Sequence, residues 1–225
     1  GLDVYFAADP CFADKARQGR PWWYRLTPRY RHFSAWERAV FEPAAATEIL
    51  LIAATEQHKF ECYYHTPARR MHLLPPGVSP DRRAPPDAAA IRKRTREKMG
   101  LVDSEYTLLM VGSGFITKGL DRAIAALARL QAQHPQRRMC LLVAGQDRER
   151  PFRLLARRKG VAQQVRFLGG RDDVPELLLA ADLLVHPARS EAAGMVLLEA
   201  LVAGLPVVVS GVCGYAHHIA AAEAG

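Results

Sequence analysis

The chain has 225 residues, of which 49% are hydrophobic, so it can bury one large or two modest cores and is not a low-complexity segment. Lys and Arg number 31 against 23 Asp and Glu, and the formal net charge of +8 favours anionic partners: nucleotides, anionic lipid or nucleic acid. No stretch approaches the ~20 consecutive apolar residues that a membrane-spanning helix needs.

Residues 1–76 are predicted to form the later half of an α/β domain. Apolar runs predict strands at 2–8, 48–53 and 71–74 and a helix at 55–64 with Thr55 as its N-cap. Asp9 follows the first strand, at the edge where doubly wound sheets bind ligands, although a turn or N-cap role is the alternative. A strand-like run follows Gly1 directly, so we expect a fragment that lacks both ends.

The segment from residue 17 to residue 38 interleaves arginines with aromatic residues, and Glu37 is its only acid. Adjacent tryptophans cannot both face a core on a regular element, and tryptophan with arginine is typical of surfaces that contact anionic membrane lipid. A core-packed aromatic helix and a platform for single-stranded nucleic acid are the alternatives. The predicted membrane-contacting residues are Arg17, Trp22, Trp23, Arg25, Arg29, Arg31 and Trp36.

Residues 77–100 are predicted to form a linker and a connecting helix, because five prolines lie between Pro75 and Pro86 and a charged amphipathic stretch then runs to Gly100. Residues 101–225 alternate apolar runs with helical stretches, which predicts a parallel sheet covered on both faces, as in doubly wound nucleotide-binding domains. Strands are expected at 107–111, 139–144, 165–168, 183–185 and 207–209, and helices at 120–133, 152–159, 174–181, 194–203 and 215–222.

Two stretches of this second domain suggest phosphate binding. The glycine-rich residues 111–119 lie between a strand and a helix, where backbone amides can hold phosphates, yet they match neither a Walker loop nor a dinucleotide fingerprint. Residues 186–210 form a strand–helix–strand unit with small residues, Ala192 to Gly194, at the start of its helix, which is typical of an anion site. Glu199 lies on that otherwise apolar helix and should face solvent or a polar ligand.

Glu191 and Glu199, with seven residues between them, resemble the E-x7-E signature of retaining GT-B glycosyltransferases of family 4, which transfer sugars from nucleotide sugars. The resemblance implies two Rossmann-like α/β domains, the N-terminal one incomplete. It assigns the donor hexose to Glu191 and the ribose hydroxyls to Glu199. Amides that contact the hexose and diphosphate would come from Ala193, Gly194, Met195 and Val196.

The same resemblance assigns further donor contacts. Lys118 matches the lysine of the family's Gly-Arg-…-Lys-Gly loop, in which Ser113 replaces the arginine, and Arg82 is the candidate replacement cation, with a solvated linker arginine as the alternative. His217 matches a histidine near the phosphates, although packing is the alternative because the His217–His218 pair lacks metal-ligand spacing. Predicted donor contacts are also Gly112, Ser113 and Thr117 in the phosphate loop and Arg171 and Val174 in a base-binding turn.

In combination these motifs resemble the lipopolysaccharide-core heptose glucosyltransferases. The resemblance implies transfer of glucose from UDP-glucose to an inner-core heptose at the cytoplasmic face of the bacterial inner membrane, without metal, other cofactor or nucleic acid. Asp9, Glu191 and Lys118 are the predicted catalytic residues, and the scattered cysteines favour reduced, cytosolic thiols. Another donor, such as a UDP-hexosamine, and a non-catalytic basic membrane-binding module are the alternatives. The fragment alone is expected not to turn over.

Overall fold

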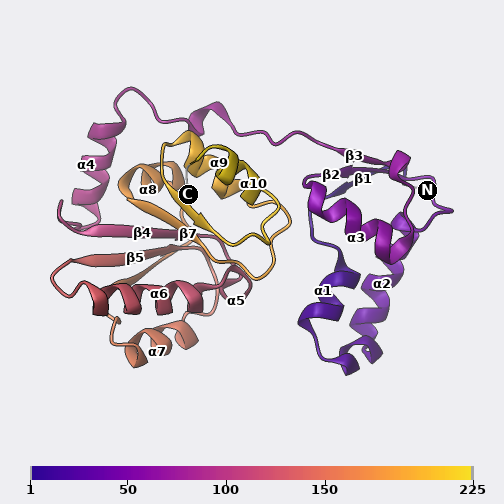
Figure 1. Cartoon of the computed structure of the whole chain (residues 1–225), viewed down its shortest axis with the longest axis horizontal. Coiled ribbons are helices and arrows are strands. Elements are labelled where there is room, and N and C mark those ends of the chain that lie inside the picture. Colours follow the sequence, from indigo (N-terminus) through magenta and orange to yellow (C-terminus); the bar gives the residue numbers. More distant parts are fainter. Residues whose placement is uncertain (1, 224–225) are drawn as a thin grey trace. The chain divides into compact units, whose positions relative to one another are not determined.

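The computed structural model describes residues 2–223 and divides the chain into two compact units (Figure 1). The first unit consists of residues 1–77 with 190–193, and the second of residues 78–189 with 194–225. Gly1, the start of the predicted fragment, and residues 224–225 lie outside the described part of the chain.

The first unit has a three-stranded parallel sheet in the order β1-β2-β3. Ile49 and Leu51 of the central strand are fully buried, and Phe41 and Phe60 stack beside them with ring centroids 3.8 Å apart. The three predicted strands are confirmed, with shorter bounds. The elements are β1 (Val4–Ala7), α1 (Phe12–Gly19), η1 (Trp22–Leu26), α2 (Pro28–Phe41), β2 (Glu48–Leu51), α3 (Ala54–Tyr64), η2 (Ala68–Arg70) and β3 (Met71–Leu73).

Two acids from other elements hold the start of α1. The carboxylate of Glu56 accepts a hydrogen bond from the Cys11 amide (2.8 Å), and that of Glu37 accepts from the amides of Phe12 (2.6 Å) and Ala13 (3.0 Å). Negative charge is favourable at a helix N-terminus. Burial nevertheless raises the pKa of Glu37, because desolvation disfavours the charged form.

The N-cap predicted for α3 is wrong. The helix begins one residue earlier than the sequence indicated, at Ala54, and Ala53 holds the N-cap position without a side-chain hydrogen bond. Thr55 therefore lies inside the first turn of the helix. The side chain of Glu56, which could serve that turn, points instead to the amide of Cys11.

The aromatic segment of the first unit faces solvent rather than a core. Trp22 is 72% exposed, Trp23 54% and Trp36 63%, while Phe41 is the buried residue of α2. The alternative of a core-packed aromatic helix is therefore wrong, and membrane contact stays a prediction. Within residues 2–223 the structure has no helix that combines the length and the apolar character needed to cross a bilayer.

The second unit has a five-stranded parallel sheet in the order β6-β5-β4-β7-β8. Helices α6 and α7 cover one face, and α4, α8 and α9 cover the other (Figure 1). The chain moves outward in opposite directions from β4 and β7, and the carboxyl edge at such a switch point is where doubly wound sheets bind ligands. The elements are η3 (Pro80–Arg82), α4 (Ala88–Lys98), β4 (Tyr106–Val111), α5 (Phe115–Lys118), α6 (Leu120–Gln133), β5 (Met139–Ala144), α7 (Arg150–Arg158), β6 (Val165–Gly169), α8 (Val174–Ala180), β7 (Leu183–His186), α9 (Met195–Val202), β8 (Val207–Val209) and α10 (Ala216–Ala221).

Helix α4, predicted as a connecting helix, belongs to the second unit and packs against α8. Arg92 donates hydrogen bonds to the carbonyls of Leu179 (3.0 Å) and Ala181 (2.6 Å) at the end of α8. Arg96 is 3% exposed and donates to the Ala180 carbonyl (2.9 Å). Cations are favourable at a helix C-terminus, so this charged helix is fixed to the sheet domain rather than being a free linker.

Candidate functional site

The loop after β4 and the loop after β7 meet at the carboxyl edge of the second sheet. Gly119 approaches the Pro187 carbonyl so closely that a Cβ on Gly119 would lie 2.1 Å from that oxygen. The Arg189 amide donates to the Thr117 carbonyl (2.7 Å), so that each loop contacts the backbone of the other. The two loops are therefore fixed to each other through their backbones.

The short helix α5, which follows β4, is also anchored from β5. Asp147 accepts a hydrogen bond from the Phe115 amide (2.7 Å), and the Ser113 hydroxyl accepts from the Gln146 amide (3.0 Å). Ser113, predicted to contact the donor, thus orders the loop with its side chain. Sequence reasoning missed Asp147 and Gln146, because only the pairing of β4 with β5 brings them here.

A pocket of about 440 Å³ opens beside this loop. It contains four of the predicted donor-binding residues: Gly112 and Ser113 follow β4, and Arg171 and Val174 follow β6. Glycine allows two close approaches in the lining of the pocket: a Cβ on Gly145 would lie 2.4 Å from the Gly112 carbonyl oxygen, and a Cβ on Gly170 would lie 2.7 Å from Gln146 Nε2. The full lining is Val111, Gly112, Ser113, Ala144, Gly145, Gln146, Gly170, Arg171, Asp172 and Val174.

The arginine that lines this pocket is paired with an acid. Arg171 donates from Nε (2.7 Å) and Nη2 (2.5 Å) to the carboxylate of Asp173. This ion pair raises the pKa of Arg171 and holds that of Asp173 below its usual value. Because Arg171 is paired with Asp173, the turn after β6 would contact a ligand mainly through its backbone and small side chains.

Lys118 brings positive charge to the phosphate loop. It ends α5, and its side chain folds back over the loop glycine: a Cβ on Gly112 would lie 3.5 Å from Lys118 Cε. Gly112 has a φ of 132°, in the region that favours glycine. Lys118 and Gly112 thus lie together in this loop, and contact of either residue with a phosphate stays a prediction.

Glu199 faces a cation. Its Oε1 lies 3.8 Å from Arg82 Nε, and both side chains are largely buried, with 21% and 29% exposed. The segment that carries Arg82 is fixed to α9 by a hydrogen bond from the Ala84 amide to the Val202 carbonyl (3.1 Å). The structure therefore brings Arg82 to the predicted ribose-binding acid, a pairing that the sequence did not indicate.

The remaining predicted residues are distributed over both units. Gly194, Met195 and Val196 form the start of α9, where Gly194 has a φ of 94° and the helix has no side-chain cap. Glu191 and Ala193 lie in the segment grouped with the first unit, as does the exposed Asp9. His217 hydrogen-bonds through Nδ1 to the Gly214 carbonyl (2.8 Å), and its ring lies 4.0 Å from that of His218, whose pKa is lowered by burial.

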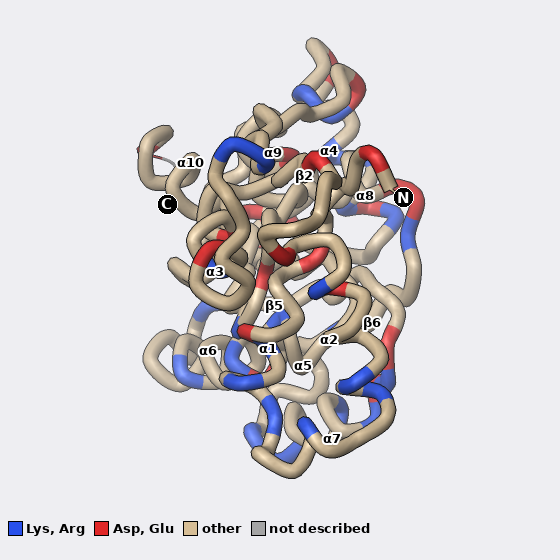
Figure 2. Tube along the Cα trace, turned by 90° about the vertical axis from the view of Figure 1, so that its right-hand side faces the viewer, with Lys and Arg blue, Asp and Glu red and all other residues tan. Residues whose placement is uncertain are grey.

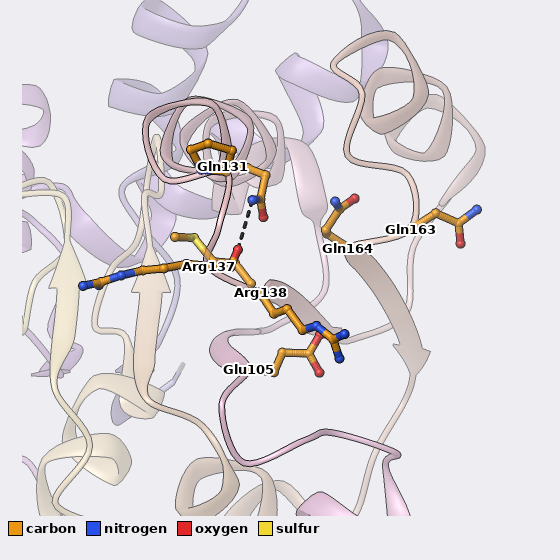
Figure 3. Close-up of a pocket in the computed structure, with 8 residues that line it drawn as sticks. Glu105, Gln131, Arg137, Arg138, Gln163 and Gln164 are labelled. Carbon is orange, nitrogen blue, oxygen red and sulfur yellow. Dashed lines mark hydrogen bonds between the residues drawn. The ribbon is translucent and has the colours of Figure 1, made fainter.

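A larger cavity, of about 550 Å³, lies at the opposite edge of the same sheet, where β4, β5 and β6 begin. Figure 3 shows Arg137 and Gln163 pointing away from the other labelled side chains. Gln131 donates to the Arg137 carbonyl (3.0 Å). Ligands of doubly wound sheets bind at the carboxyl edge, so we place the functional site in the smaller pocket.

Positive charge alone does not mark the site. Helix α7 carries four exposed arginines, and Lys and Arg (blue) gather along it in Figure 2. One of them, Arg153, pairs with Glu149 (2.7 Å). The site is therefore defined by its loops and pocket rather than by the surplus of basic residues.

The sheet order and the pocket at the carboxyl ends of β4, β5 and β6 define a doubly wound α/β protein of the kind that binds nucleotide ligands at this edge. Residues 91–225 match the family described as "Glycosyl transferases group 1". The chain therefore belongs to this family, as the sequence predicted.

Similar proteins agree with this assignment. The chain is 48% identical over 225 residues to lipopolysaccharide glucosyltransferase WaaG of Escherichia coli strain K12. The matched region covers all of this chain and 60% of WaaG. It is 36% identical over 187 residues to D-inositol 3-phosphate glycosyltransferase 2 of Catenulispora acidiphila, covering 78% of this chain and 43% of that protein. The chain thus spans less than two thirds of the length of these relatives.

Solved structures confirm the fold. The crystal structure of WaaG, described as a glycosyltransferase involved in lipopolysaccharide biosynthesis, superposes with a TM-score of 0.93 at 48% identity, over 99% of this chain and 60% of that one. Anabaena Alr3699/HepE in complex with UDP and glucose superposes with a TM-score of 0.73 at 22% identity, over 96% of this chain and 55% of that one. The predicted GT-B architecture and the predicted resemblance to the lipopolysaccharide-core enzymes are confirmed.

Proposed function

We propose that this chain serves the transfer of glucose from UDP-glucose to an inner-core heptose of lipopolysaccharide, with retention of configuration. The observation that carries the proposal is the pocket at the carboxyl ends of β4, β5 and β6, which joins the predicted base-binding turn to the predicted phosphate loop. The 48% identity to the lipopolysaccharide glucosyltransferase WaaG supports the acceptor class. UDP and glucose in the HepE complex support the donor class.

The contacts proposed for the donor follow from the chemistry of the lining. Uracil would occupy the pocket beside Arg171 and Val174, where backbone groups offer both donors and acceptors. The diphosphate would lie at the Gly112–Lys118 loop, held by amides and the ammonium group of Lys118. Glu199 would accept hydrogen bonds from the two ribose hydroxyls, next to Arg82.

The proposed reaction breaks the bond between the glucose anomeric carbon and the diphosphate oxygen. Negative charge develops on the departing UDP, and Lys118, Arg82 and the N-terminal dipole of α9 would stabilise it. The acceptor hydroxyl would attack from the face that UDP leaves, passing its proton to the departing oxygen. We infer that no metal or other cofactor is needed. The positioning roles of Glu191 and Asp9 stay predictions from the resemblance.

Calorimetric titration with UDP-glucose, UDP-N-acetylglucosamine, GDP-glucose and ADP-glucose tests the donor. We expect tight binding of UDP-glucose alone, and at least a tenfold loss in Lys118→Met. The exposed Lys159 provides a matched control, since Lys159→Met should bind normally. Tighter binding of the hexosamine would overturn the glucose assignment, and absence of all nucleotide binding would overturn the proposal.

We further propose that the exposed aromatic segment contacts anionic lipid at the cytoplasmic face of the inner membrane. Trp22, Trp23 and Trp36 are exposed among arginines, which suits the headgroup region. Co-sedimentation with phosphatidylglycerol vesicles should fall at least fivefold in a Trp22→Ser/Trp23→Ser variant and remain normal in Val102→Ser, which alters an exposed apolar residue of the second unit. Binding to RNA without binding to vesicles would instead indicate a nucleic-acid surface.

A further inference from the structure

Arg189 and Asp121 form a bidentate ion pair at the carboxyl edge of the second sheet. Nη1 of Arg189 lies 2.8 Å from Oδ1 of Asp121, and Nη2 lies 2.6 Å from Oδ2. The pair joins the loop after β7 to the first turn of α6. Two parallel hydrogen bonds fix the orientation of a guanidinium group as well as its distance.

The same guanidinium also holds the element that carries Lys118. Nη1 of Arg189 donates to the Ile116 carbonyl (2.8 Å), and the Arg189 amide donates to the Thr117 carbonyl (2.7 Å). These two carbonyls belong to α5, which has four residues. One helical turn is not stable alone, because nucleation costs more than a single turn returns. Order in α5 therefore depends on groups outside it.

We propose that Arg189 and Asp121 are positioning residues for Lys118: their ion pair fixes α5 so that the lysine meets the diphosphate of a bound nucleotide. The ligand named here rests on the proposed function, whereas the mechanical role does not. Lys118 needs this support because a shift of about 1 Å in a charged group is enough to weaken its contact with a phosphate strongly.

The exposure of both side chains indicates that the Arg189–Asp121 pair positions α5 more than it stabilises the whole unit. Each side chain is 37% exposed, and exposed ion pairs contribute little to the free energy of unfolding. The Arg189 guanidinium holds the pKa of Asp121 below its usual value, so both partners are charged at neutral pH. Loss of Arg189 should therefore loosen α5 without unfolding the unit.

Titrations with UDP and with uridine, which lacks the phosphates, test the proposal. Arg189→Met should weaken UDP binding about three- to tenfold and leave uridine binding unchanged. A merely structural defect would weaken both ligands equally. Because Arg189 acts through Lys118, the double variant Lys118→Met/Arg189→Met should lose no more UDP affinity than Lys118→Met alone.

Two further variants sharpen the test. Asp121→Asn should weaken UDP binding less than Arg189→Met does, because the Arg189 guanidinium keeps its hydrogen bond to the Ile116 carbonyl. Arg153→Met is the matched control, because Arg153 makes an ion pair of similar length (2.7 Å) with Glu149 on the surface of α7. Arg153→Met should bind UDP as wild type does. Equal UDP affinity in wild type and Arg189→Met would overturn the proposal.

Amide hydrogen exchange without nucleotide tests whether the Arg189–Asp121 pair fixes α5, independently of any ligand. Residues 115–119 should exchange at least threefold faster in Arg189→Met than in wild type or Arg153→Met. Unchanged exchange there would overturn the positioning role whatever the ligand is. A wild-type chain that binds no UDP but shows faster exchange in Arg189→Met would overturn the proposed function while supporting the fixation of α5.

Discussion

Replacing Gly119 by alanine should separate the two loops of the site. Gly119 has a φ of 76°, and a Cβ there would lie 2.1 Å from the Pro187 carbonyl oxygen and 2.9 Å from its carbon. Both atoms belong to the backbone, so no side-chain rotation relieves the clash. The loops would have to move about 1.3 Å or more apart before this contact became an ordinary one of 3.4 Å.

The cost of Gly119→Ala can be estimated from the contacts that such a movement breaks. A left-handed alanine costs about 1–2 kcal/mol, and the hydrogen bonds to the carbonyls of Thr117 and Pro187 contribute about 1 kcal/mol each. We expect the free energy of unfolding of the second unit to fall by roughly 3–4 kcal/mol, measured by urea denaturation.

Gly100→Ala is the matched control for Gly119→Ala. Gly100 also has a positive φ, of 63°, but a Cβ there would meet no atom within 4 Å. The free energy of unfolding of Gly100→Ala should therefore fall only by the cost of a left-handed alanine, about 1–2 kcal/mol. Equal losses of stability in Gly119→Ala and Gly100→Ala would contradict this prediction, because the close approach of Gly119 to Pro187 would then have no energetic consequence.

Three further predictions concern burial and charge. Arg70→Met should destabilise the first unit by about 3–5 kcal/mol in urea denaturation, because the buried guanidinium donates to three backbone carbonyls that would lose their partner. The Asp121–Arg189 pair lowers the pKa of Asp121. The stabilisation that the pair gives the folded chain should therefore be fully present above the unfolded pKa of about 3.9 and be lost as pH falls through the lowered pKa. Asp121→Asn should abolish this pH dependence, measured by amide hydrogen exchange at a series of pH values. Cys62 is exposed and the other three cysteines are buried, so a thiol reagent should modify one thiol rapidly in the folded chain and four after denaturation.

Much of the fold could be predicted because its strands are buried apolar runs. The fully buried run at residues 139–144 is β5 as the sequence indicated. Helix α1 was not predicted, because its first turn is held by Glu37 and Glu56, which lie 24 to 45 residues away along the chain. Such long-range capping leaves no local signal for a sequence pattern to report.

The site could be predicted as far as its residues lie in recognisable loops. Gly112, Ser113, Arg171 and Val174 do line one pocket. The partners that order these loops come from other strands or helices, as Asp147 does for α5, and neither spacing nor composition indicates them. The approach of Arg82 to Glu199 was missed for the same reason, since only the packing of the linker on α9 creates it.

A crystal structure of the chain with UDP would show which edge of the second sheet binds the nucleotide. We expect uracil in the pocket beside Gly112 and Val174, and the diphosphate within hydrogen-bond distance of Lys118 Nζ. Nucleotide bound instead in the cavity near Gln131 and Arg138, or at no defined position, would contradict this expectation.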